Sequence, residues 1–299
     1  MKSWIQAFRL RTLPLAFSGW LVGVSLAANA KALNLVVAGM TLLTAIFLQI
    51  LSNLANDYGD ASSGVDEKRT GEARMVSSGR ISASAMKKAM IIFSLLSLVS
   101  GSILLYLSFP KDFLSALVFL TIGLVGIAAA IKYTVGKNPY GYAGFGDVFV
   151  FVFFGLVLVF GTYYLQVQRF DWLILLPASS MGLFSVGVLN VNNIRDIASD
   201  QAAGKNSIPV RIGREAAVRY HKILLTGGML FSLLYVYLNF ESWVNLIFAL
   251  TSLLFFKSIT AVSNLPSEQL DPYLKQMAIS TLLFAILFSL GQFVPLWST

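Results

Sequence analysis

The sequence contains no cysteine and a single histidine among its 299 residues. Without cysteine there can be no disulfide, no thiolate metal site and no cysteine nucleophile. A metal ion would need oxygen ligands or His221, and His221 precedes an apolar run and is given no role. Charge is scarce too: 12% of residues are charged and 57% are hydrophobic, against about 25% charged in a soluble domain. This composition is typical of a protein that folds in lipid.

The formal charge of +8 does not indicate a nucleic-acid partner. The basic residues lie in short loops between apolar runs and not on a polar domain, so their placement indicates membrane topology and anion binding. The apolar runs follow one another evenly and leave no linker between them. We therefore predict one membrane domain over residues 1–299.

Apolar runs long enough to cross a hydrocarbon core of about 30 Å recur nine times along the chain. They lie at residues 13–30, 34–55, 89–109, 113–131, 147–167, 172–194, 222–239, 243–263 and 275–294. A signal peptide is the alternative for the first run, which follows basic residues and ends in Ala28-Asn29-Ala30, but the run is long for one. The sequence thus predicts an all-α polytopic bundle of nine transmembrane helices.

The positions of Lys and Arg test this arrangement, because they played no part in choosing the runs. Nineteen lie on one side of the predicted membrane, and three, Lys31, Lys111 and Arg169, lie on the other. Cytoplasmic loops are rich in Lys and Arg. The split predicts that the N-terminus and the two long polar loops face the cytoplasm and that the C-terminus lies outside.

Two halves of the chain share a pattern at a fixed offset of 140 residues. Asn53, Asn56, Asp60 and Gly64 correspond to Asn193, Asp196, Asp200 and Gly204. A four-helix unit used twice explains the offset, with the ninth helix outside the repeat. Parallel repeats of this kind place the functional site at the interface between the halves.

Acidic residues concentrate in two of the polar connections. Eight of the fourteen lie there, namely Asp57, Asp60, Asp66, Glu67, Glu72, Asp196, Asp200 and Glu215. On a helix, residues at i, i+3 and i+7 share one face, so each half is expected to present an oxygen-rich stripe. Carboxylates this close repel one another unless a cation intervenes, and oxygen ligands suit Mg²⁺ together with phosphate oxygens. Two facing stripes predict a Mg²⁺-diphosphate clamp.

Basic residues are interleaved with these acids. Lys68, Arg69, Arg74 and Arg80 follow the first stripe, and Lys205 and Arg211 follow the second. A diphosphate leaving group needs such donors, because guanidinium groups form bidentate hydrogen bonds with its oxygens. The richness of cytoplasmic loops in Lys and Arg is the alternative explanation, and it suffices for Lys87, Lys88, Arg214, Arg219 and Lys222.

The segment from Asn53 to Asp60 (NLANDYGD) resembles the first Asp-rich motif of the UbiA superfamily of intramembrane prenyltransferases. The DIASD segment from Asp196 to Asp200 resembles the second, DxxxD. Three further segments are similar to the 1,4-dihydroxy-2-naphthoate polyprenyltransferase branch: residues 9–15 (RLRTLPL), 133–147 and 205–213. The similarity covers most of the chain.

The resemblance implies a bundle of nine helices, Mg²⁺ between the two Asp motifs and a lipid-facing tunnel for the prenyl chain. It places the protein in the bacterial cell membrane, with polyprenyl diphosphate and 1,4-dihydroxy-2-naphthoate as substrates. The metal positions are expected at Asn56, Asp60, Asp196 and Asp200, of which Asp60 and Asp196 are also expected to be catalytic. Diphosphate binding is expected at Asn53, Asp57, Asp66, Lys68, Arg69, Arg74, Lys132, Lys137, Asn193, Lys205 and Arg211.

The chain departs from the superfamily pattern in two places. The last Asp of the first motif is replaced by Gly64, so Asp66 is the candidate for that part. The YxxxK element can be read from Tyr133 to Lys137, or with Lys132 as its lysine and Ala128 in place of the tyrosine, and both readings stay open.

The implied reaction is prenyl transfer to the naphthoate ring with loss of its carboxyl group, which gives demethylmenaquinone. Asp147, at a predicted span end, is a candidate base on the acceptor side, and an acid that merely begins a helix is the alternative. Another aromatic acceptor, such as 4-hydroxybenzoate, is the nearest alternative function. A secondary transporter is the alternative outside the class, although the acids lie on one side of the membrane and not along a midplane path.

Overall fold

The computed structural model describes residues 2–62 and 74–293, and within these ranges every regular element is a helix. The long helices are α2 (Leu13–Asn29), α3 (Leu35–Ser62), α4 (Ala83–Ser108), α5 (Phe113–Lys132), α8 (Leu175–Arg195), α11 (Arg214–Leu238), α12 (Ser252–Asn264) and α13 (Asp271–Phe293). Shorter elements are α1 (Lys2–Phe8), η1 (Leu10–Thr12), α6 (Gly146–Val150), η3 (Phe151–Phe160), α7 (Gly161–Val167), η4 (Trp172–Ile174), α9 (Ile197–Ala202), α10 (Ile208–Ile212), η5 (Trp243–Thr251) and η6 (Ser267–Gln269).

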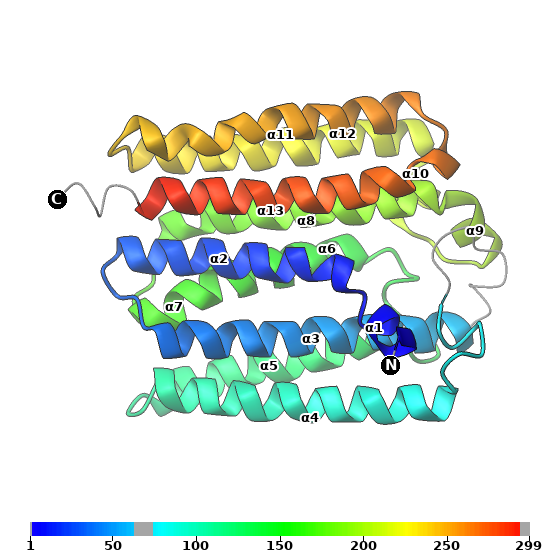
Figure 1. Cartoon of the computed structure of the whole chain (residues 1–299), viewed down its shortest axis with the longest axis horizontal. Helices are drawn as coiled ribbons and strands as arrows, with labels where there is room; N and C mark the ends of the chain where they lie inside the picture. The colour runs from blue at the N-terminus through cyan, green and yellow to red at the C-terminus, as the bar shows by residue number, and fades with distance from the viewer. Residues whose placement is uncertain (1, 63–73, 294–299) are drawn as a thin grey trace.

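The helices lie side by side in one bundle (Figure 1). Among the described residues, eight helical segments are long and apolar enough to cross a membrane. A ninth is added if α1 and α2 count as one span bent by 51°. The predicted all-α membrane bundle is therefore confirmed, and each of the nine predicted apolar runs coincides with a helix.

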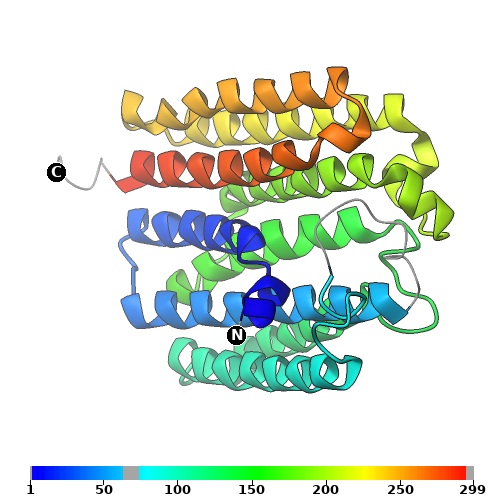
Figure 2. The same cartoon turned by 45° about the vertical axis from the view of Figure 1, so that its right-hand side comes forward.

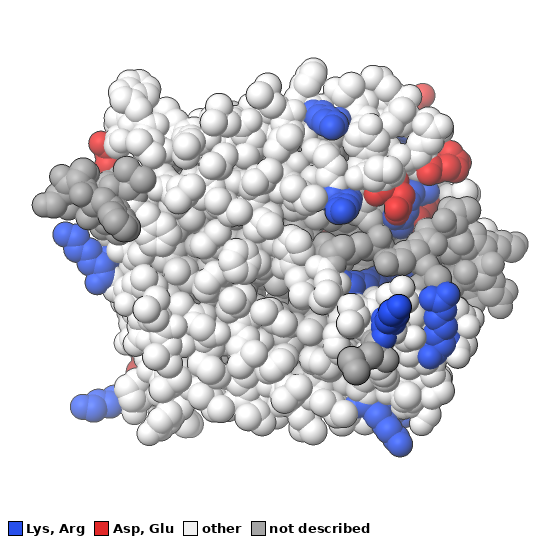
Figure 3. Space-filling model, viewed as in Figure 1, with Lys and Arg blue, Asp and Glu red and all other residues white. Residues whose placement is uncertain are grey.

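The molecule has two charged ends separated by a wide uncharged band (Figure 3). Large apolar side chains are exposed along that band, for example Leu95 at 56%, Leu117 at 47% and Leu253 at 73%. Such a surface would be unfavourable in water and suits hydrocarbon, because lipid tails solvate apolar side chains. The molecule is a multi-pass membrane protein.

The two halves are assembled in the same way. In the first, α3 packs along α4, and α5 packs against both. In the second, α8 packs along α11, which packs against α12. The helix made of α6, η3 and α7 takes the position next to α8 that α2 takes next to α3. This arrangement agrees with the predicted four-helix repeat.

Helix α13 lies outside the repeat and joins its halves. It packs against α2 and η1 of the first half and against α8 and η5 of the second (Figures 1 and 2). The contact between η3 and α8 is close because it runs over glycines. A Cβ added to Gly155 would lie 2.6 Å from the carbonyl oxygen of Ala178, so only glycine permits this approach.

The larger hydrophobic core lies in the second half, between α8, α11, α12 and α13. Phe184 is fully buried there, and its ring centroid is 4.4 Å from that of Phe255 and 4.7 Å from that of Phe284. The single histidine belongs to this region. His221 is fully buried and its Nε2 lies 3.1 Å from the Ser258 hydroxyl, so it is an interhelical contact and not a solvated residue.

Helix ends differ from the predicted spans where polar turns extend a helix beyond its apolar run. Helix α3 continues to Ser62, past the predicted end at residue 55, and α11 begins at Arg214, before the predicted start at residue 222. The second motif differs in another way. A turn at Asp196 separates α8 from α9, so Asn193 and Asp200 do not share one uninterrupted helix.

Candidate active site

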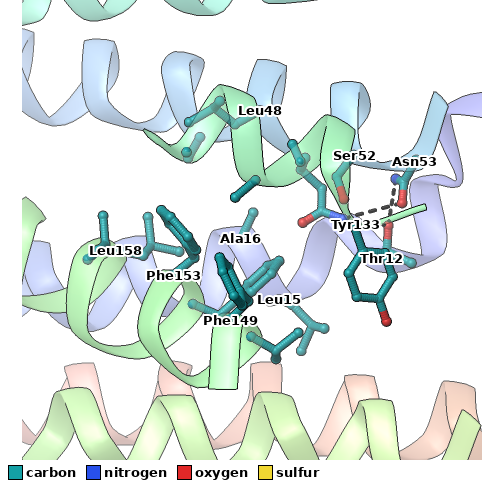
Figure 4. A pocket seen from close by; sticks show the side chains of 18 of the residues that line it. Thr12, Leu15, Ala16, Leu48, Ser52, Asn53, Tyr133, Phe149, Phe153 and Leu158 are labelled. Carbon is teal, nitrogen blue, oxygen red and sulfur yellow. Dashed lines mark hydrogen bonds between the residues drawn. The ribbon is translucent and has the colours of Figure 1, made fainter. Parts of the chain in front are cut away.

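A cavity of about 420 Å³ lies between the two halves, and we call it the central cavity. Most of its walls come from α2, α3, α4, α5, η3, α8 and α13, with further residues from α1, η1, α6 and α7. One end is polar and carries residues of the first Asp-rich motif. The rest is apolar, with side chains such as Leu48, Phe153 and Leu158. In Figure 4, Phe149 and Phe153 point into the space beside Leu15 and Ala16, while Thr12, Asn53 and Tyr133 gather at the other end.

The central cavity follows the bundle over most of its thickness. On α3 it is lined from Thr41 to Asp60, which at 1.5 Å per residue corresponds to about 28 Å. A hydrocarbon core is about 30 Å thick. The cavity can therefore hold a long apolar chain whose polar head sits at one membrane surface.

Asp60 is the centre of the polar end. Its carboxylate accepts a hydrogen bond from Arg74 Nη2 at 2.8 Å and one from the Tyr142 hydroxyl at 2.8 Å. The side chain is almost fully buried, at 4% exposure. The stripe predicted on this helix is present, because α3 stays helical through Asp60 and brings Asn53, Asn56 and Asp60 to the same cavity.

Two members of the stripe hold neighbouring segments in place. Asn53 Nδ2 donates to the carbonyl oxygen of Phe8 and to the Thr12 hydroxyl, both at 2.9 Å, and so fastens the turn at η1 to α3. Asp57 accepts the backbone N–H groups of Met75 at 3.0 Å and Val76 at 2.9 Å. Both residues line the cavity, and their described contacts are positioning contacts.

Asn56 is held against the end of α5. The Thr134 hydroxyl donates to the carbonyl oxygen of Ala55 at 2.9 Å and lies 3.3 Å from Asn56 Oδ1. The approach depends on Gly59, where an added Cβ would lie 2.6 Å from the Thr134 carbonyl oxygen. A side chain at this position would push the end of α5 away from the stripe.

The second motif lies beside the cavity. Asp196 receives two hydrogen bonds from the adjacent Arg195, Nε to Oδ1 at 2.7 Å and Nη2 to Oδ2 at 2.8 Å. Asp200 accepts from Lys205 Nζ at 3.2 Å and from the Ser207 hydroxyl at 3.2 Å. Burial raises the pKa of the Asp200 carboxyl, and the nearby Lys205 ammonium lowers it only in part.

The loop from Tyr140 to Gly146 connects the two motifs. The Tyr142 hydroxyl reaches Asp60 in the first half, and its carbonyl oxygen accepts from the Asn206 N–H of the second half at 2.9 Å. Arg211 donates to the carbonyl oxygen of Ala143. Gly144 has a φ of 76°, a left-handed conformation that glycine adopts without strain.

The Tyr133 hydroxyl lies among acids from three elements. Loss of hydration raises the pKa of this phenol, and the negative charges of Asp147, Asp60 and Asp200 raise it further. The phenol therefore stays protonated and can donate a hydrogen bond. Asp147, the predicted base, accepts from the Tyr220 hydroxyl at 3.0 Å.

The structure brings some of the predicted residues together and leaves others apart. Those that line the central cavity are Asn53, Asn56, Asp57, Asp60, Arg74, Asn193 and Lys205. Those described but not lining it are Lys132, Lys137, Asp147, Asp196, Asp200 and Arg211. Asp66, Lys68 and Arg69 lie outside the described residues. Both candidate lysines of the YxxxK element are exposed, so neither reading of that element gains support from the cavity.

Sequence reasoning gave no role to several residues that line the cavity or contact the motifs. These are Arg9, Gln49, Tyr142, Arg195 and Lys275. Arg195 was overlooked because it was counted only among the basic residues of a polar connection. Its position directly before Asp196, a predicted metal ligand, is a signal that could have identified it. Arg9 has a φ of 47°, which is strained for a residue other than glycine and marks the turn between α1 and α2.

The donor set suits a hard cation. Asn56 and Asp60 present oxygen atoms to the cavity from α3, and Asn193 faces it from α8. Asn193 Oδ1 is buried and has no hydrogen-bond partner among the described residues, so an acceptor there awaits a cation or donor. No group of three or more Asp, Glu or His within residues 2–62 and 74–293 is close enough to hold a metal unaided. Substrate oxygens would have to complete the shell, as Mg²⁺ commonly requires.

Comparison with known proteins gives a consistent result. The chain is 44% identical to 1,4-dihydroxy-2-naphthoate octaprenyltransferase of Haemophilus influenzae, over 98% of this chain and 96% of that protein. It is 40% identical to the Escherichia coli protein of the same name, over 99% and 97%.

The fold also matches solved structures. A UbiA homolog from Aeropyrum pernix aligns with a TM-score of 0.70 and 17% identity, over 96% of this chain and 97% of that one. A UbiA homolog from Archaeoglobus fulgidus bound to GPP and Mg²⁺ aligns with a TM-score of 0.63 and 19% identity, over 96% and 99%. The family model for UbiA prenyltransferases matches residues 16–282, and the chain belongs to this family.

Proposed function

We propose that the protein transfers a polyprenyl chain from its diphosphate to 1,4-dihydroxy-2-naphthoate, with loss of the carboxyl group, in the synthesis of menaquinone. The observation that carries the reaction type is the central cavity, which joins a buried polar end to an apolar part and is lined by α3 over about 28 Å in all. The choice of acceptor rests on two relatives of this activity that align over nearly the whole chain at 44% and 40% identity.

The bound donor would lie with its chain in the apolar part of the cavity and its diphosphate at the polar end. Arg74 and Lys205 line that end and can neutralise the leaving group, because both carry donors for phosphate oxygens. Each now pairs with a carboxylate, at 2.8 Å to Asp60 and 3.2 Å to Asp200. Binding of the donor would redirect these cations toward the new negative charge.

The bond changes balance without a redox partner and give the quinol form of demethylmenaquinone, so oxidation to the quinone is a separate step. The allylic C–O bond breaks and its electron pair leaves with the diphosphate. The electron-rich ring forms the new C–C bond, and the carboxylate departs as CO₂ and leaves its bonding pair in the ring. An aromatic face can stabilise positive charge on the allylic carbon, and the ring that lies at the polar end of the cavity is that of Tyr133.

Mg²⁺ is the cofactor we propose for this site. When bound, it supplies positive charge to the diphosphate oxygens as they become the leaving group. Asn56, Asp60 and the unpaired oxygen of Asn193 would hold it from the cavity walls. Asp196 and Asp200, which were expected as ligands, are buried beside the cavity. For them we propose direct coordination only if Arg195 and Lys205 turn away.

The remaining assignments follow from the same placement. We propose Tyr133 as a hydrogen-bond donor to the acceptor and Asp147 as the base behind it. We also propose that the whole chain is one domain in the cell membrane, with its motif-bearing end in the cytoplasm, as the distribution of Lys and Arg predicts.

The experiment is prenyl transfer by purified protein in detergent, with octaprenyl diphosphate and either dihydroxynaphthoate or 4-hydroxybenzoate. Each reaction is run with Mg²⁺, after EDTA, and after Mg²⁺ is restored. Asp60→Asn removes the charge of the central carboxylate, and Asp112→Asn removes that of an exposed acid at the start of α5.

We expect product from the naphthoate only, lost with EDTA, regained with Mg²⁺, absent in Asp60→Asn and unchanged in Asp112→Asn. Product from 4-hydroxybenzoate but not from the naphthoate would show that the proposed acceptor is wrong and that 4-hydroxybenzoate takes its place. No product from either, in protein with an intact melting transition, would refute the function and favour a transporter.

A further inference from the structure

We propose that Lys275 of α13 recognises the carboxylate of the aromatic acceptor and so selects a ring that carries an acid. The inference rests on the proposed function and names a specificity residue within it. Lys275 lines the central cavity together with Leu274 and Ala278, one turn from the start of α13. No motif of the sequence pointed to it.

Lys275 differs from the other described cations of the cavity in having no partner. Arg74 pairs with Asp60, and Lys205 pairs with Asp200. Within residues 2–62 and 74–293, the Lys275 ammonium makes no ion pair or hydrogen bond, although Asp271 lies one turn away on the same helix and pairs with Arg195 instead. Lys275 is exposed as well as lining the cavity, so its ammonium lies at the edge of the cavity and, with no counter-charge, is available to an anionic ligand that enters there.

The wall that carries Lys275 is distinct from the wall that carries the metal motif. Asp57 and Asp60 lie on α3, and their negative charges would repel an incoming carboxylate. The α13 wall has no acid among the residues lining the cavity, which are Leu274, Lys275 and Ala278. A carboxylate is therefore favoured on the α13 side.

The apolar surroundings fit a flat ring as well as a carboxylate. Leu15 and Ala16 of α2 and Val188 and Leu189 of α8 line the cavity, and both helices pack against α13. A naphthalene ring held between these surfaces would leave its acid group toward Lys275. The long chain of the donor would occupy the part of the cavity that is lined by α4 and α5.

The place of α13 in the fold gives a reason for this division. The two repeated halves present similar oxygen-rich segments, which suits a diphosphate and its metal. The acceptor has no counterpart within that symmetry, and α13 is the helix outside the repeat. It supplies a group that neither half provides.

The test compares Lys275→Met, which keeps the length of the side chain and removes the charge, with Lys275→Arg, which keeps the charge. The matched control is Lys87→Met. Lys87 is exposed, as Lys275 is, and stands four residues after the first residue of α4 as Lys275 does in α13, but it does not line the cavity.

Two readouts are measured for each protein. The first is KM for dihydroxynaphthoate and for octaprenyl diphosphate. The second is the Kd of 1-hydroxy-2-naphthoate and of 1-naphthol without any prenyl donor, which reports recognition of the carboxylate independently of turnover.

We expect Lys275→Met to raise the KM for the naphthoate by about 10- to 100-fold, the effect of losing a charge-assisted hydrogen bond. It should leave the KM for the diphosphate unchanged and abolish the preference for 1-hydroxy-2-naphthoate over 1-naphthol. Lys275→Arg should restore most of both, and Lys87→Met should match the wild type.

An active wild type with an unchanged naphthoate KM and Kd ratio in Lys275→Met would overturn this inference and leave the proposed function standing. A raised KM for octaprenyl diphosphate alone would also overturn it, because Lys275 would then serve the donor. A wild type that turns over no naphthoate would refute the proposed function and this inference together.

Discussion

Gly59→Ala should separate the geometry of the site from its chemistry, because it alters no polar group. An added Cβ would lie 2.6 Å from the backbone carbonyl oxygen of Thr134, and ordinary contact begins at 3.4 Å, so the end of α5 must move by 0.8 Å, the difference between the two. The obstructing atom belongs to the backbone and cannot rotate away. Asn56 and Tyr133, which lie on either side of this contact, would move apart.

Two magnitudes follow from that shift. Overpacking of this kind costs about 1–3 kcal/mol of stability, and alanine returns about 1 kcal/mol through its better helix propensity. The net loss should be about 0–2 kcal/mol in the free energy of unfolding. A misplacement near 1 Å lowers catalytic rates by about 100-fold, so kcat should fall much more than stability does.

The assay is prenyl transfer together with thermal melting in the same detergent, and the chain offers its own control. Gly39 lies on the same helix, and a Cβ added there meets no heavy atom within 4 Å. Gly39→Ala should keep wild-type kcat and melt at the same temperature or slightly higher. If Gly59→Ala retains the wild-type rate, or if both variants lose it equally, the close approach of α5 to α3 is not what positions the site.

Three further predictions concern other parts of the site. Tyr142→Phe removes the donor 2.8 Å from Asp60, and the loss of a hydrogen bond to a charged group, about 1.5 kcal/mol or more, should lower kcat by about tenfold or more; an unchanged kcat would contradict this. Arg195→Met leaves Asp196 in a buried site without its bidentate partner and should lower the free energy of unfolding by about 3–5 kcal/mol in a denaturant titration. Asp271→Asn changes a half-exposed acid and should lower it by less than about 1 kcal/mol, and equal losses would contradict the importance of the buried pair. Gly123 lines the cavity, and a Cβ added there meets no heavy atom within 4 Å, so Gly123→Phe has room to place a ring in the cavity. Octaprenyl diphosphate should then react more slowly while geranyl diphosphate keeps its rate, and equal slowing of both donors would argue against a tunnel along α5.

The helices could be predicted because lipid imposes a single rule on every span. An apolar run of sufficient length must be helical, since its backbone groups have no water to bond with. The same rule says nothing about polar turns, so the extension of α3 through Asp60 and of α11 back to Arg214 lay beyond it. The stripe on α3 was predictable because the helix continues. The turn at Asp196 was not, because no glycine or proline marks it in the sequence.

The site was predictable as far as the same pattern of Asn and Asp residues repeats along the chain. Helical spacing and recurrence after 140 residues identify three site residues from the sequence alone: Asn56, Asp60 and Asn193. Lys275 and Tyr133 are single residues in ordinary settings, and only packing brings them to the same cavity. Ion pairs between distant residues likewise depend on the fold. The sequence shows Arg195 next to Asp196, but it does not show that Asp271, 76 positions further along the chain, also pairs with Arg195.

The shape of the central cavity has a consequence for how the reaction must be measured. The cavity has one charged end and an apolar remainder, and its total length along α3 is near the thickness of the hydrocarbon core. Like a phase-transfer catalyst, it brings together a water-soluble anion and a lipid-soluble chain. The donor then reaches its binding site by diffusing in two dimensions, and its effective concentration is a mole fraction in the lipid or detergent phase. Adding detergent at a fixed bulk amount of octaprenyl diphosphate lowers the mole fraction of the donor in the micelles and should slow turnover. The same addition should leave the KM for the naphthoate unchanged. The KM of the donor should therefore be expressed as a mole fraction in the lipid or detergent phase, and the KM of the naphthoate as a concentration in water.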